Sequence, residues 1–483
     1  MTMDNRSRWL ALYVLCLGDL MIVLDGTIVN VALPSIRDDL GFSQTSLAWI
    51  VNGYLLTFGG FLLLGGRLGD LFGHRRLFLI GTSLFTVASL GCGVASSQGL
   101  LVGARAVQGV GGAIVSAVAL SLLMTLFTEQ ADRAKAMGVF GFVLSGGGVV
   151  GVLAGGILTD VLNWHWIFLV NLPVGVLVYF LSLRLLPTER VAATGRVDVA
   201  GAITVTGSLM LAVYAIINGN EQGWSSAQTL GLLGGAVALL GLFLAIEARV
   251  ASPLMPLGLF RNRNVSTANF IGVLMAAGMF SYFFFSALYL QLVLAYTPLE
   301  VGLAYLPGTV IWGASSLLLS DRLVMRFGIK PPLLTGLALM TLALILLART
   351  PVDGNWAIDI LPATVAVGIG AGIAFNPILL AAMSGVTPDQ AGLASGVVNT
   401  AFMMGGAVGL AILASLADSR HQSLIASGHE SLAALNGGYH VAFVVGAIFL
   451  VASAAVAAVL LRVEAPQPHG GEVGVPAAAE ADG

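Results

Sequence analysis

Long apolar segments recur along the whole chain and are separated by short polar connections. A helix needs about 20 apolar residues to cross the hydrocarbon core of a bilayer. Fourteen segments meet that requirement, at 10–33, 46–66, 77–97, 100–127, 137–160, 166–186, 199–217, 229–246, 266–293, 301–320, 332–348, 358–383, 392–416 and 439–461. The pattern therefore predicts an all-α integral membrane protein with fourteen transmembrane helices.

The first apolar segment has one feature of a secretory signal, because Arg6 and Arg8 precede it. Asp19 and Asp25 interrupt its apolar run, however, and the segment is too long for the hydrophobic region of a signal peptide. We therefore expect it to be retained as the first membrane helix.

Composition supports the membrane assignment and excludes other classes of protein. Asp, Glu, Lys and Arg make up 9% of the 483 residues, where a soluble domain carries about 25%. Hydrophobic residues make up 57%, and the mean hydropathy is +0.95. These values exclude a soluble globular protein, a disordered chain, a collagen and a disulfide scaffold.

Charge and titratable residues give no sign of a nucleic-acid partner, a metal or a cofactor. The net charge of −3 leaves no basic surface for nucleic acid. The histidines show no spacing typical of metal ligands. Cys16 and Cys92 both lie within apolar runs, so we expect no disulfide between them.

Positive charge predicts the orientation of the chain in the membrane. With the N-terminus in the cytoplasm, 17 of the 21 Lys and Arg residues fall in cytoplasmic segments, 3 fall outside and Arg105 lies within a span. Because the number of spans is even, both termini are expected to be cytoplasmic. Arg outnumbers Lys 19 to 2, which favours a GC-rich bacterial genome and hence the bacterial plasma membrane.

The connections between the spans are too short to fold as separate domains. The longest covers 418–438 and is expected to hold a short interfacial helix on the outside. Residues 464–483 are rich in Ala, Pro, Glu and Gly, a composition that predicts a disordered cytoplasmic tail. The chain is therefore expected to form one integral unit and to be a monomer.

Three ionisable residues lie clearly within the apolar segments: Asp19, Asp25 and Arg105. Such residues are costly at membrane depth and usually serve function. Burial disfavours the charged form of a carboxyl group, so Asp19 and Asp25 are candidate proton carriers, with Arg105 as a switch partner. Their spacing of six residues places the two carboxylates about 120° apart on a helix, facing different grooves. The alternative is that these residues only hold helices together.

Glycines form a second pattern. In the fifth segment they recur every four residues, with one more beside the last: Gly147, Gly151, Gly155 and Gly156. A four-residue repeat lines one face of a helix and lets another helix approach closely. The pattern predicts contacts that suit rocking movements, or ordinary membrane packing, and the thirteenth segment repeats it at Gly405 and Gly409.

The connection after the second segment, GGRLGDLFGHRR, combines small and charged residues. Gly66 and Gly73 permit a tight turn, and Asp70 can form ion pairs with Arg75 and Arg76 at a helix end. Topology alone requires the arginines but not the aspartate. We therefore interpret these five residues as a conformational switch that holds one state closed.

The ninth segment carries a run of aromatic residues that ends at Gln291. Helical geometry sends such a run around all sides, so some rings face lipid while others can line an apolar cavity and stack on a flat or cationic ligand. The candidate residues for a substrate cavity, over the whole chain, are Asn30, Phe284, Tyr289, Gln291, Asn376 and Asn399.

These segments together resemble the major facilitator superfamily, and in particular its fourteen-helix drug:proton antiporter family. LDGTIVNVALPSI is similar to the first-helix motif of that family, with matches at Asp25 and Asn30. GGRLGDLFGHRR is similar to the superfamily loop motif. ARAVQGVGG is similar to the fourth-helix motif, which adds Gln108 and Gly109 to the switch residues beside Arg105.

Two further blocks carry the resemblance. The glycines of the fifth segment are similar to the antiporter motif, although Val152 stands where that motif has proline. WHWIFLVNLPVG, at 164–175, looks like a block typical of fourteen-helix exporters, with His165 where arginine is usual. The resemblance extends over 10–461.

The resemblance implies two six-helix halves, at 10–186 and 266–461, each built from inverted three-helix repeats. An inserted two-helix linker, at 199–246, lies between them. DRLVMRFGIK, after the tenth segment, looks like a weakened second copy of the loop motif, as an internal repeat requires.

The function expected from these residues and the resemblance is proton-coupled export, by alternating access, of amphipathic drugs or antibiotics with aromatic or cationic character. Its partners are a drug-like small molecule, protons and the bilayer, and the proton gradient replaces a cofactor. No catalytic cluster indicates an enzyme, and neither Lys135 nor Lys330 lies in a nucleotide-binding loop. A narrow-substrate exporter of a host metabolite, a proton-coupled importer and a non-transporting sensor remain alternatives.

Overall fold

The structure, a computed structural model, describes residues 4–187, 198–384 and 386–462. All regular secondary structure in these ranges is helical. Within them, fourteen helical segments are long and apolar enough to cross a membrane, which confirms the number predicted from the sequence.

The first six spans, called the N-terminal half, are α1 (Asn5–Leu40), α2 (Ala48–Phe72), α3 (His74–Gly93), α4 (Gln98–Leu126), α5 (Gln130–Val161) and the pair α6 (Trp166–Leu169) and α7 (Asn171–Leu185). The inserted pair is α8 (Val199–Gln222) and α9 (Ala227–Glu247), which the short helix η1 (Leu257–Arg261) follows.

The last six spans, called the C-terminal half, begin with α10 (Arg263–Leu288) and its extension η2 (Tyr289–Val293). The others are α11 (Pro298–Ser315) with η3 (Ser316–Ser320) and α12 (Asp321–Phe327), α13 (Lys330–Leu347), η4 (Trp356–Ile360) with α14 (Leu361–Met383), α15 (Pro388–Ala426) and α16 (Ser431–Leu460).

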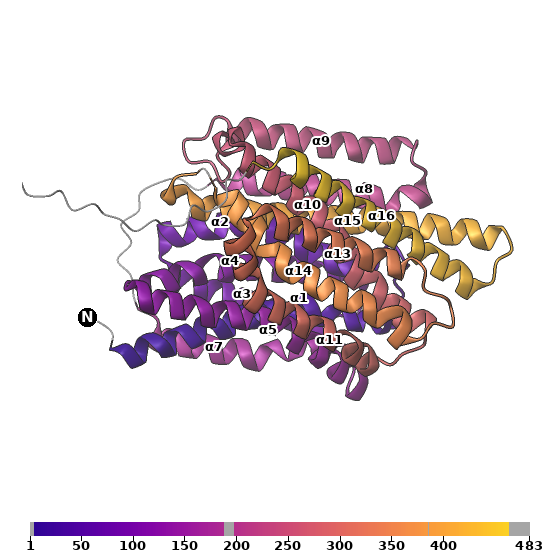
Figure 1. The fold of residues 1–483 in the computed structure, drawn as a ribbon, viewed down its shortest axis with the longest axis horizontal. Helices are drawn as coiled ribbons and strands as arrows, with labels where there is room; N and C mark the ends of the chain where they lie inside the picture. The colour runs from indigo at the N-terminus through magenta and orange to yellow at the C-terminus, as the bar shows by residue number, and fades with distance from the viewer. Residues whose placement is uncertain (1–3, 188–197, 385, 463–483) are drawn as a thin grey trace, which may run out of the picture.

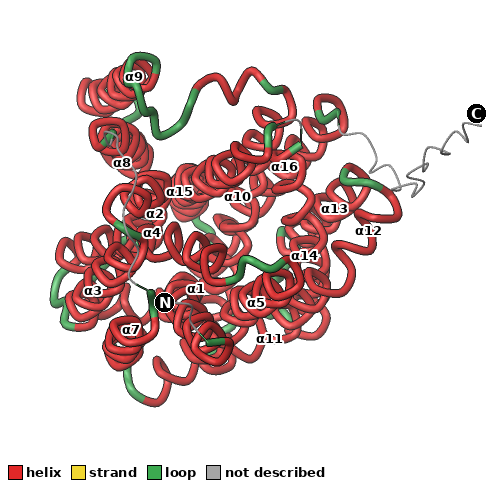
Figure 2. Tube along the Cα trace, turned by 90° about the vertical axis from the view of Figure 1, so that its left-hand side faces the viewer, coloured by secondary structure: helices red, strands yellow, loops and turns green. Residues whose placement is uncertain are grey.

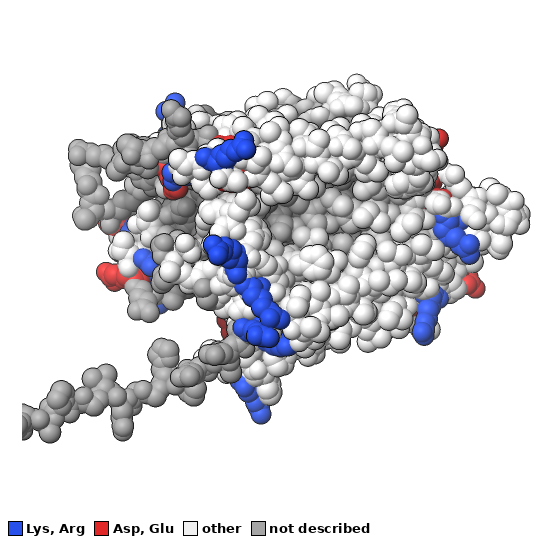
Figure 3. Space-filling model, turned by 90° about the horizontal axis from the view of Figure 1, so that it is seen from above, with Lys and Arg blue, Asp and Glu red and all other residues white. Residues whose placement is uncertain are grey.

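The helices run side by side along the long axis of the molecule (Figure 1). Seen along that axis, α8 and α9 lie at the edge of the bundle, with α8 against α2 and α15 (Figure 2). On the face shown in Figure 3, charged side chains gather toward the two ends of the long axis and leave an uncharged belt between them. This distribution suits a protein whose middle is surrounded by hydrocarbon.

The connection between the second and third helices of each half turns at a glycine. Gly73 ends α2 with φ +92°, and Gly328 ends α12 with φ +81°, a conformation that glycine adopts without steric cost. The two turns therefore match, as the predicted second copy of the loop motif requires. Counted from these glycines, Met325 occupies the place of Asp70, so the second copy lacks the carboxylate at that place.

The glycines spaced at four residues on α5 all face α1: Gly147, Gly151 and Gly155. A Cβ atom on Gly155 would lie 2.7 Å from the carbonyl oxygen of Ile28, so no larger residue fits without a shift of the helix. Gly156 faces the other half, where a Cβ atom would lie 2.7 Å from the carbonyl oxygen of Pro298 on α11. The motif thus serves close packing within one half and contact between the halves.

The same arrangement recurs in the C-terminal half, where α15 packs on α10. A Cβ atom on Gly405 would lie 2.6 Å from Cα of Val273, and one on Gly409 would lie 2.7 Å from Cα of Ala277. The fifth helix of each half therefore meets the first helix of that half through glycines. This correspondence agrees with the internal repeat, while the exact domain boundaries stay a prediction.

The expectation for 418–438 is wrong. Helix α15 continues to Ala426 and α16 begins at Ser431, so the connection is only 427–430. Polar residues do not end a helix unless a conformational breaker follows, and here the turn comes at Gly428, with φ +86°. The extended ends pack closely, since a Cβ atom on Gly438 would lie 2.6 Å from the carbonyl oxygen of Ala417. The predicted tail at 464–483 lies outside the described residues.

Substituting Gly155 by valine is expected to force α5 away from α1, because the added atoms would meet the Ile28 carbonyl group. Overpacking of this kind destabilises by about 1–3 kcal/mol, which should lower the thermal unfolding midpoint of the purified protein. Gly148→Val on the same helix is the control, because a Cβ atom there meets nothing within 4 Å. Equal midpoints for the two variants would contradict this packing role.

Candidate functional site

A buried polar cluster surrounds Asp25 of α1 in the N-terminal half. One carboxylate oxygen, Oδ2, accepts a hydrogen bond from Nη1 of Arg105 on α4, and the two side chains form an ion pair. The other oxygen, Oδ1, accepts hydrogen bonds from Nε2 of Gln108 at 2.7 Å and from Nδ2 of Asn171 at 2.9 Å. All four residues are buried. One carboxylate therefore joins α1, α4 and α7.

The guanidinium group of Arg105 finds its other partners within the same cluster. Its Nε donates to the carbonyl oxygen of Ile50 at 3.1 Å, and Nη1 also donates to Oε1 of Gln108 at 2.7 Å. The Cζ atom lies 4.4 Å from the ring centroid of Tyr54 and 5.6 Å from that of Phe168. Hydrogen bonds and cation–π contacts together offset the cost of removing this charge from water.

Ser89 of α3 completes the cluster. It accepts hydrogen bonds from Gln108 at 2.8 Å and from Asn171 at 3.5 Å. Sequence reasoning missed Ser89, Asn171 and the ring of Tyr54. For Asn171 a signal was present, because it is an amide in the apolar block WHWIFLVNLPVG. Serine and tyrosine are common in membrane helices, so the other two gave no comparable signal.

Asp19 is placed differently, although it lies on the same helix. Its Oδ1 accepts a hydrogen bond from Oγ of Ser116 on α4 at 2.7 Å, while Oδ2 has no partner among the described residues. The side chain is buried, and among the described residues no cation forms a salt bridge with it. A proton could therefore be added to Asp19 without breaking an ion pair.

The expectation that Asp19 and Asp25 face different grooves is wrong, because both contact α4. Helix α4 runs antiparallel to α1, so Ser116 lies beside Asp19 while Arg105 lies beside Asp25. Asp19 and Asp25 lie about 9 Å apart along the axis of α1, so each can meet α4 at a different level.

The turn after α2 also differs from the expectation. Asp70 lies 3.3 Å from Nε2 of His74 and 3.8 Å from Nη1 of Arg67, and among the described residues it forms its ion pair with Arg67. Arg75 instead donates to the carbonyl oxygen of Leu183 on α7 at 2.5 Å. The positive φ of Gly73 turns the chain away from the axis of α2, so Asp70 reaches the residues within one helical turn rather than the arginines beyond.

The remaining candidate switch residues differ in how closely they are packed. Gly109 lets α4 lie against α2, since a Cβ atom there would be 2.5 Å from the carbonyl oxygen of Tyr54. Gly66 is less constrained, with only the Ala117 side chain at 4.0 Å. Arg76 is exposed. The close contact at Gly109 sits between the Asp25 cluster and the α2 helix that carries Asp70.

The candidate substrate residues do not form one group. Gln291 donates to the carbonyl oxygen of Val31 at 2.8 Å and so bridges the two halves. Tyr289 is buried and donates to the carbonyl oxygen of Pro351 at 2.6 Å, and Phe284 is buried within the C-terminal half.

The three candidate asparagines are partly buried or bonded to their own helix. Asn30 donates to the carbonyl oxygen of Thr27 at 3.3 Å, and Asn399 donates to that of Ser395 at 3.2 Å. Asn376 is half-buried. Their role in substrate contact stays a prediction.

Comparison with known proteins agrees with this architecture. The sequence matches the Major Facilitator Superfamily over residues 15–410. It is 39% identical to the puromycin resistance protein of Streptomyces alboniger, over 98% of this chain and 95% of that protein. It is 38% identical to the cephamycin export protein of Amycolatopsis lactamdurans, over 97% of this chain and 96% of that protein.

A third relative and a solved structure extend the comparison. The multidrug resistance protein Stp of Mycobacterium tuberculosis is 35% identical, over 85% of this chain and 76% of that protein. The crystal structure of an auto-inhibited POT family peptide transporter matches with a TM-score of 0.65, over 96% of this chain and 99% of that one. Its sequence identity is 15%, so it shows the fold alone.

The fourteen candidate spans and the family match together identify a multi-span membrane transporter. The chain belongs to the major facilitator superfamily and is related to fourteen-helix drug-resistance exporters. The resemblance, the fold class and the expectation of a transporter rather than an enzyme are thereby confirmed.

Removing one partner of the Asp25–Arg105 pair is expected to destabilise the protein by about 3–5 kcal/mol, because the other charge stays buried and unpaired. Asp25→Leu and Arg105→Met should each lower stability against unfolding in mixed micelles, and the double variant should lose less than the two singles added together. Additive losses would show that the two side chains do not interact.

Proposed function

We propose that this protein exports drug-like or antibiotic molecules across the bacterial plasma membrane and that proton entry drives the export. Relatives named for puromycin resistance, cephamycin export and multidrug resistance support the substrate class. The observation that carries the coupling proposal is the buried Asp25–Arg105 ion pair, which lies near a second buried carboxyl group on the same helix.

Protonation of Asp25 would cancel its charge and so weaken the attraction that holds Arg105 of α4 against α1. The hydrogen bonds from Gln108 and Asn171 to the carboxylate would weaken at the same time. One proton can therefore weaken the contacts that Asp25 makes between α1, α4 and α7. A shift between two conformations requires such a difference in interaction free energy between them.

Asp19 supports this mechanism as a second proton site. Its unpaired oxygen can carry a proton without disturbing an ion pair, and Ser116 links it to the same helix α4. Two carboxyl groups with unequal partners can take up protons in sequence. In this proposal Arg105 is the switch partner of Asp25, and Asp19 is the carrier that takes a proton without breaking an ion pair.

The two halves meet through surfaces that suit a rocking movement. A Cβ atom on Gly59 of α2 would lie 3.3 Å from the carbonyl oxygen of Thr400 on α15, and Gly156 of α5 meets α11 more closely still. Gln291 and Val31 share a hydrogen bond that crosses between the halves. Contacts made by small residues are smooth, so they permit the halves to change their angle.

Substitution of Asp25 by asparagine mimics a permanently protonated carboxyl group and keeps its shape. We expect Asp25→Asn to abolish protonophore-sensitive efflux of ethidium or puromycin from energised cells, with accumulation rising to the level of cells that lack the protein. Exchange of internal for external drug in proteoliposomes should persist, because exchange needs no net proton movement. Asp19→Asn should lower efflux in the same way.

The matched control is Asp38→Asn, because Asp38 lies on the same helix, is exposed and, within the part of the chain that the structure describes, forms its ion pair with Arg37. It should leave efflux unchanged. Full protonophore-sensitive efflux by Asp25→Asn would refute the coupling role. Uptake driven by an inward proton gradient would identify an importer, and efflux of puromycin without ethidium would identify a narrow-substrate exporter.

The proposed orientation places both termini and the α2–α3 turn in the cytoplasm. In intact cells, a membrane-impermeant maleimide should label Ser427→Cys, on the α15–α16 turn, but not Arg76→Cys, on the α2–α3 turn. Inside-out vesicles should give the reverse pattern. Background labelling is small because Cys16 and Cys92 are both buried. Labelling of Arg76→Cys in intact cells would show that the orientation is the reverse of the proposed one.

A further inference from the structure

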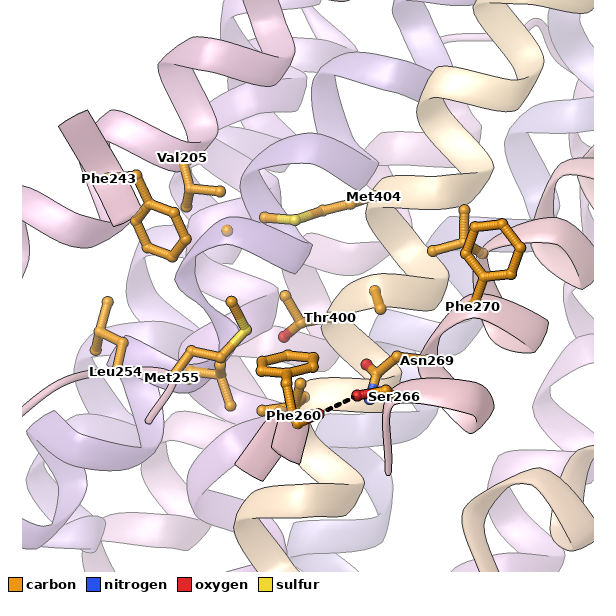
Figure 4. A pocket seen from close by; sticks show the side chains of 15 residues that line it. Val205, Phe243, Leu254, Met255, Phe260, Ser266, Asn269, Phe270, Thr400 and Met404 are labelled. Carbon is orange, nitrogen blue, oxygen red and sulfur yellow. Dashed lines mark hydrogen bonds between the residues drawn. The ribbon is translucent and has the colours of Figure 1, made fainter. Parts of the chain in front are cut away.

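A cavity of 340 Å³ lies outside the Asp25 cluster, between the inserted pair and the two halves. Its walls come from α2, α8, α9, α10 and α15 and from the connection that follows α9. None of the six candidate substrate residues lines it. Figure 4 shows Val205 and Phe243 of the inserted pair on one side of the cavity and Phe270 of α10 on the opposite side.

The walls of the cavity are almost wholly apolar and carry no charged side chain among the described residues. Aromatic rings of Phe243, Phe260 and Phe270 contribute flat surface, and Met255 and Met404 contribute adaptable surface. Phe270 is exposed, so the cavity reaches the lipid-facing surface of the bundle. A neutral, largely apolar molecule suits such a lining, while an ion does not.

Two of the residues that line this cavity are polar and buried, and each carries an atom without a hydrogen-bond partner. Among the described residues, Oδ1 of Asn269 and Oγ1 of Thr400 have no partner, and each residue is only 7% exposed. The Nδ2 atom of Asn269 already donates to the carbonyl oxygen of Val265 at 2.8 Å, which fixes the amide. An unpaired polar atom in an apolar interior is costly, so a bound donor would gain its full hydrogen bond.

We propose that this cavity binds one neutral amphipathic small molecule, whose apolar body fills the space and whose hydroxyl or N–H group donates one hydrogen bond to Oδ1 of Asn269 or to Oγ1 of Thr400. The volume lies at the lower end of the range for small-ligand sites, about 300–1,000 Å³. A lipid acyl chain would fill the apolar space but would leave both polar atoms unpaired.

The site depends on the inserted pair and on both halves. Asn269 belongs to α10 and Thr400 to α15, both in the C-terminal half. Gly60 of α2, in the N-terminal half, also lines the cavity. Gly60 also packs against α8, where a Cβ atom would lie 1.9 Å from Oγ1 of Thr206. A ligand there touches both halves at once, so its affinity must change when they move relative to each other.

The connection after α9 closes one end of the cavity. The backbone N–H of Met255 donates to Oε2 of Glu247 at 3.2 Å, which anchors this connection to the end of α9. Oγ of Ser266 donates to the carbonyl oxygen of Phe260 at 2.6 Å and holds η1 against α10 (Figure 4). These bonds hold the Met255 and Phe260 side chains in place as walls.

The test uses two probes with the same fused rings, 2-naphthol, which has a hydrogen-bond donor, and 2-methoxynaphthalene, which has none. Binding is measured by equilibrium dialysis of the full chain in nanodiscs against empty nanodiscs of the same lipid. The wild type should bind one equivalent of 2-naphthol about tenfold more tightly than 2-methoxynaphthalene, as expected for one hydrogen bond to an otherwise unpaired acceptor.

Combined Asn269→Leu and Thr400→Val substitutions should remove this preference and leave 2-methoxynaphthalene binding intact. Ala401→Phe should fill the cavity and abolish binding of both probes. Thr341→Val is the matched control, because its buried hydroxyl group lies on α13, donates to the Leu337 carbonyl oxygen and does not line this cavity. It should keep the tenfold preference.

Three results would overturn the proposal. Equal affinities of the wild type for the two probes would show that no polar atom of the cavity accepts a hydrogen bond from the hydroxyl group of 2-naphthol. Binding that survives in a folded Ala401→Phe variant would place the probes elsewhere. A co-purified phospholipid that is retained against 2-naphthol, and lost in Ala401→Phe, would assign the cavity to an acyl chain. Each readout is binding, so none of them depends on whether export is proton-coupled.

Discussion

Hydrocarbon offers no hydrogen bonds, so every charge within the bundle must find its partners in the protein. The Asp25–Arg105 pair meets this constraint with partners from several helices. The carboxylate is held by α4 and α7, and the guanidinium group by α4 itself, the Ile50 carbonyl oxygen of α2 and two aromatic rings. The positions of α1, α2, α4 and α7 are therefore linked through two charges, and a change of one protonation state acts on all four helices.

Close packing of helices at glycine residues is the second constraint on the bundle. Membrane helices gain little from hiding apolar surface, because lipid is apolar too, so close van der Waals packing must hold them together. In each half the fifth helix meets the first through glycines, at Gly155 against Ile28 and at Gly409 against Ala277. Gly156 makes the same kind of close contact with α11 of the other half. Helix α1 therefore takes part both in the Asp25–Arg105 ion pair and in the close glycine contact with α5.

The inserted pair adds a surface that twelve helices alone would not make. Helix α8 lies against α2 and α15, where the two halves meet, and with α9 it walls a cavity that reaches the lipid. Asn269 and Thr400, each with an atom that has no partner among the described residues, line that cavity.

The sequence by itself determined the fourteen spans, the glycine spacing and the candidacy of Asp25 and Arg105, because apolar length, a four-residue period and a charge in an apolar run are properties of the chain alone. Only the tertiary structure decided which side chains meet. Asn171 and Ser89 complete the cluster, Asp70 lies beside Arg67 and His74, and 418–426 continues a helix. The physical reason is that serine, threonine and asparagine can bond to their own helix, so their presence in an apolar segment does not reveal whether they face a neighbour, a cavity or their own backbone.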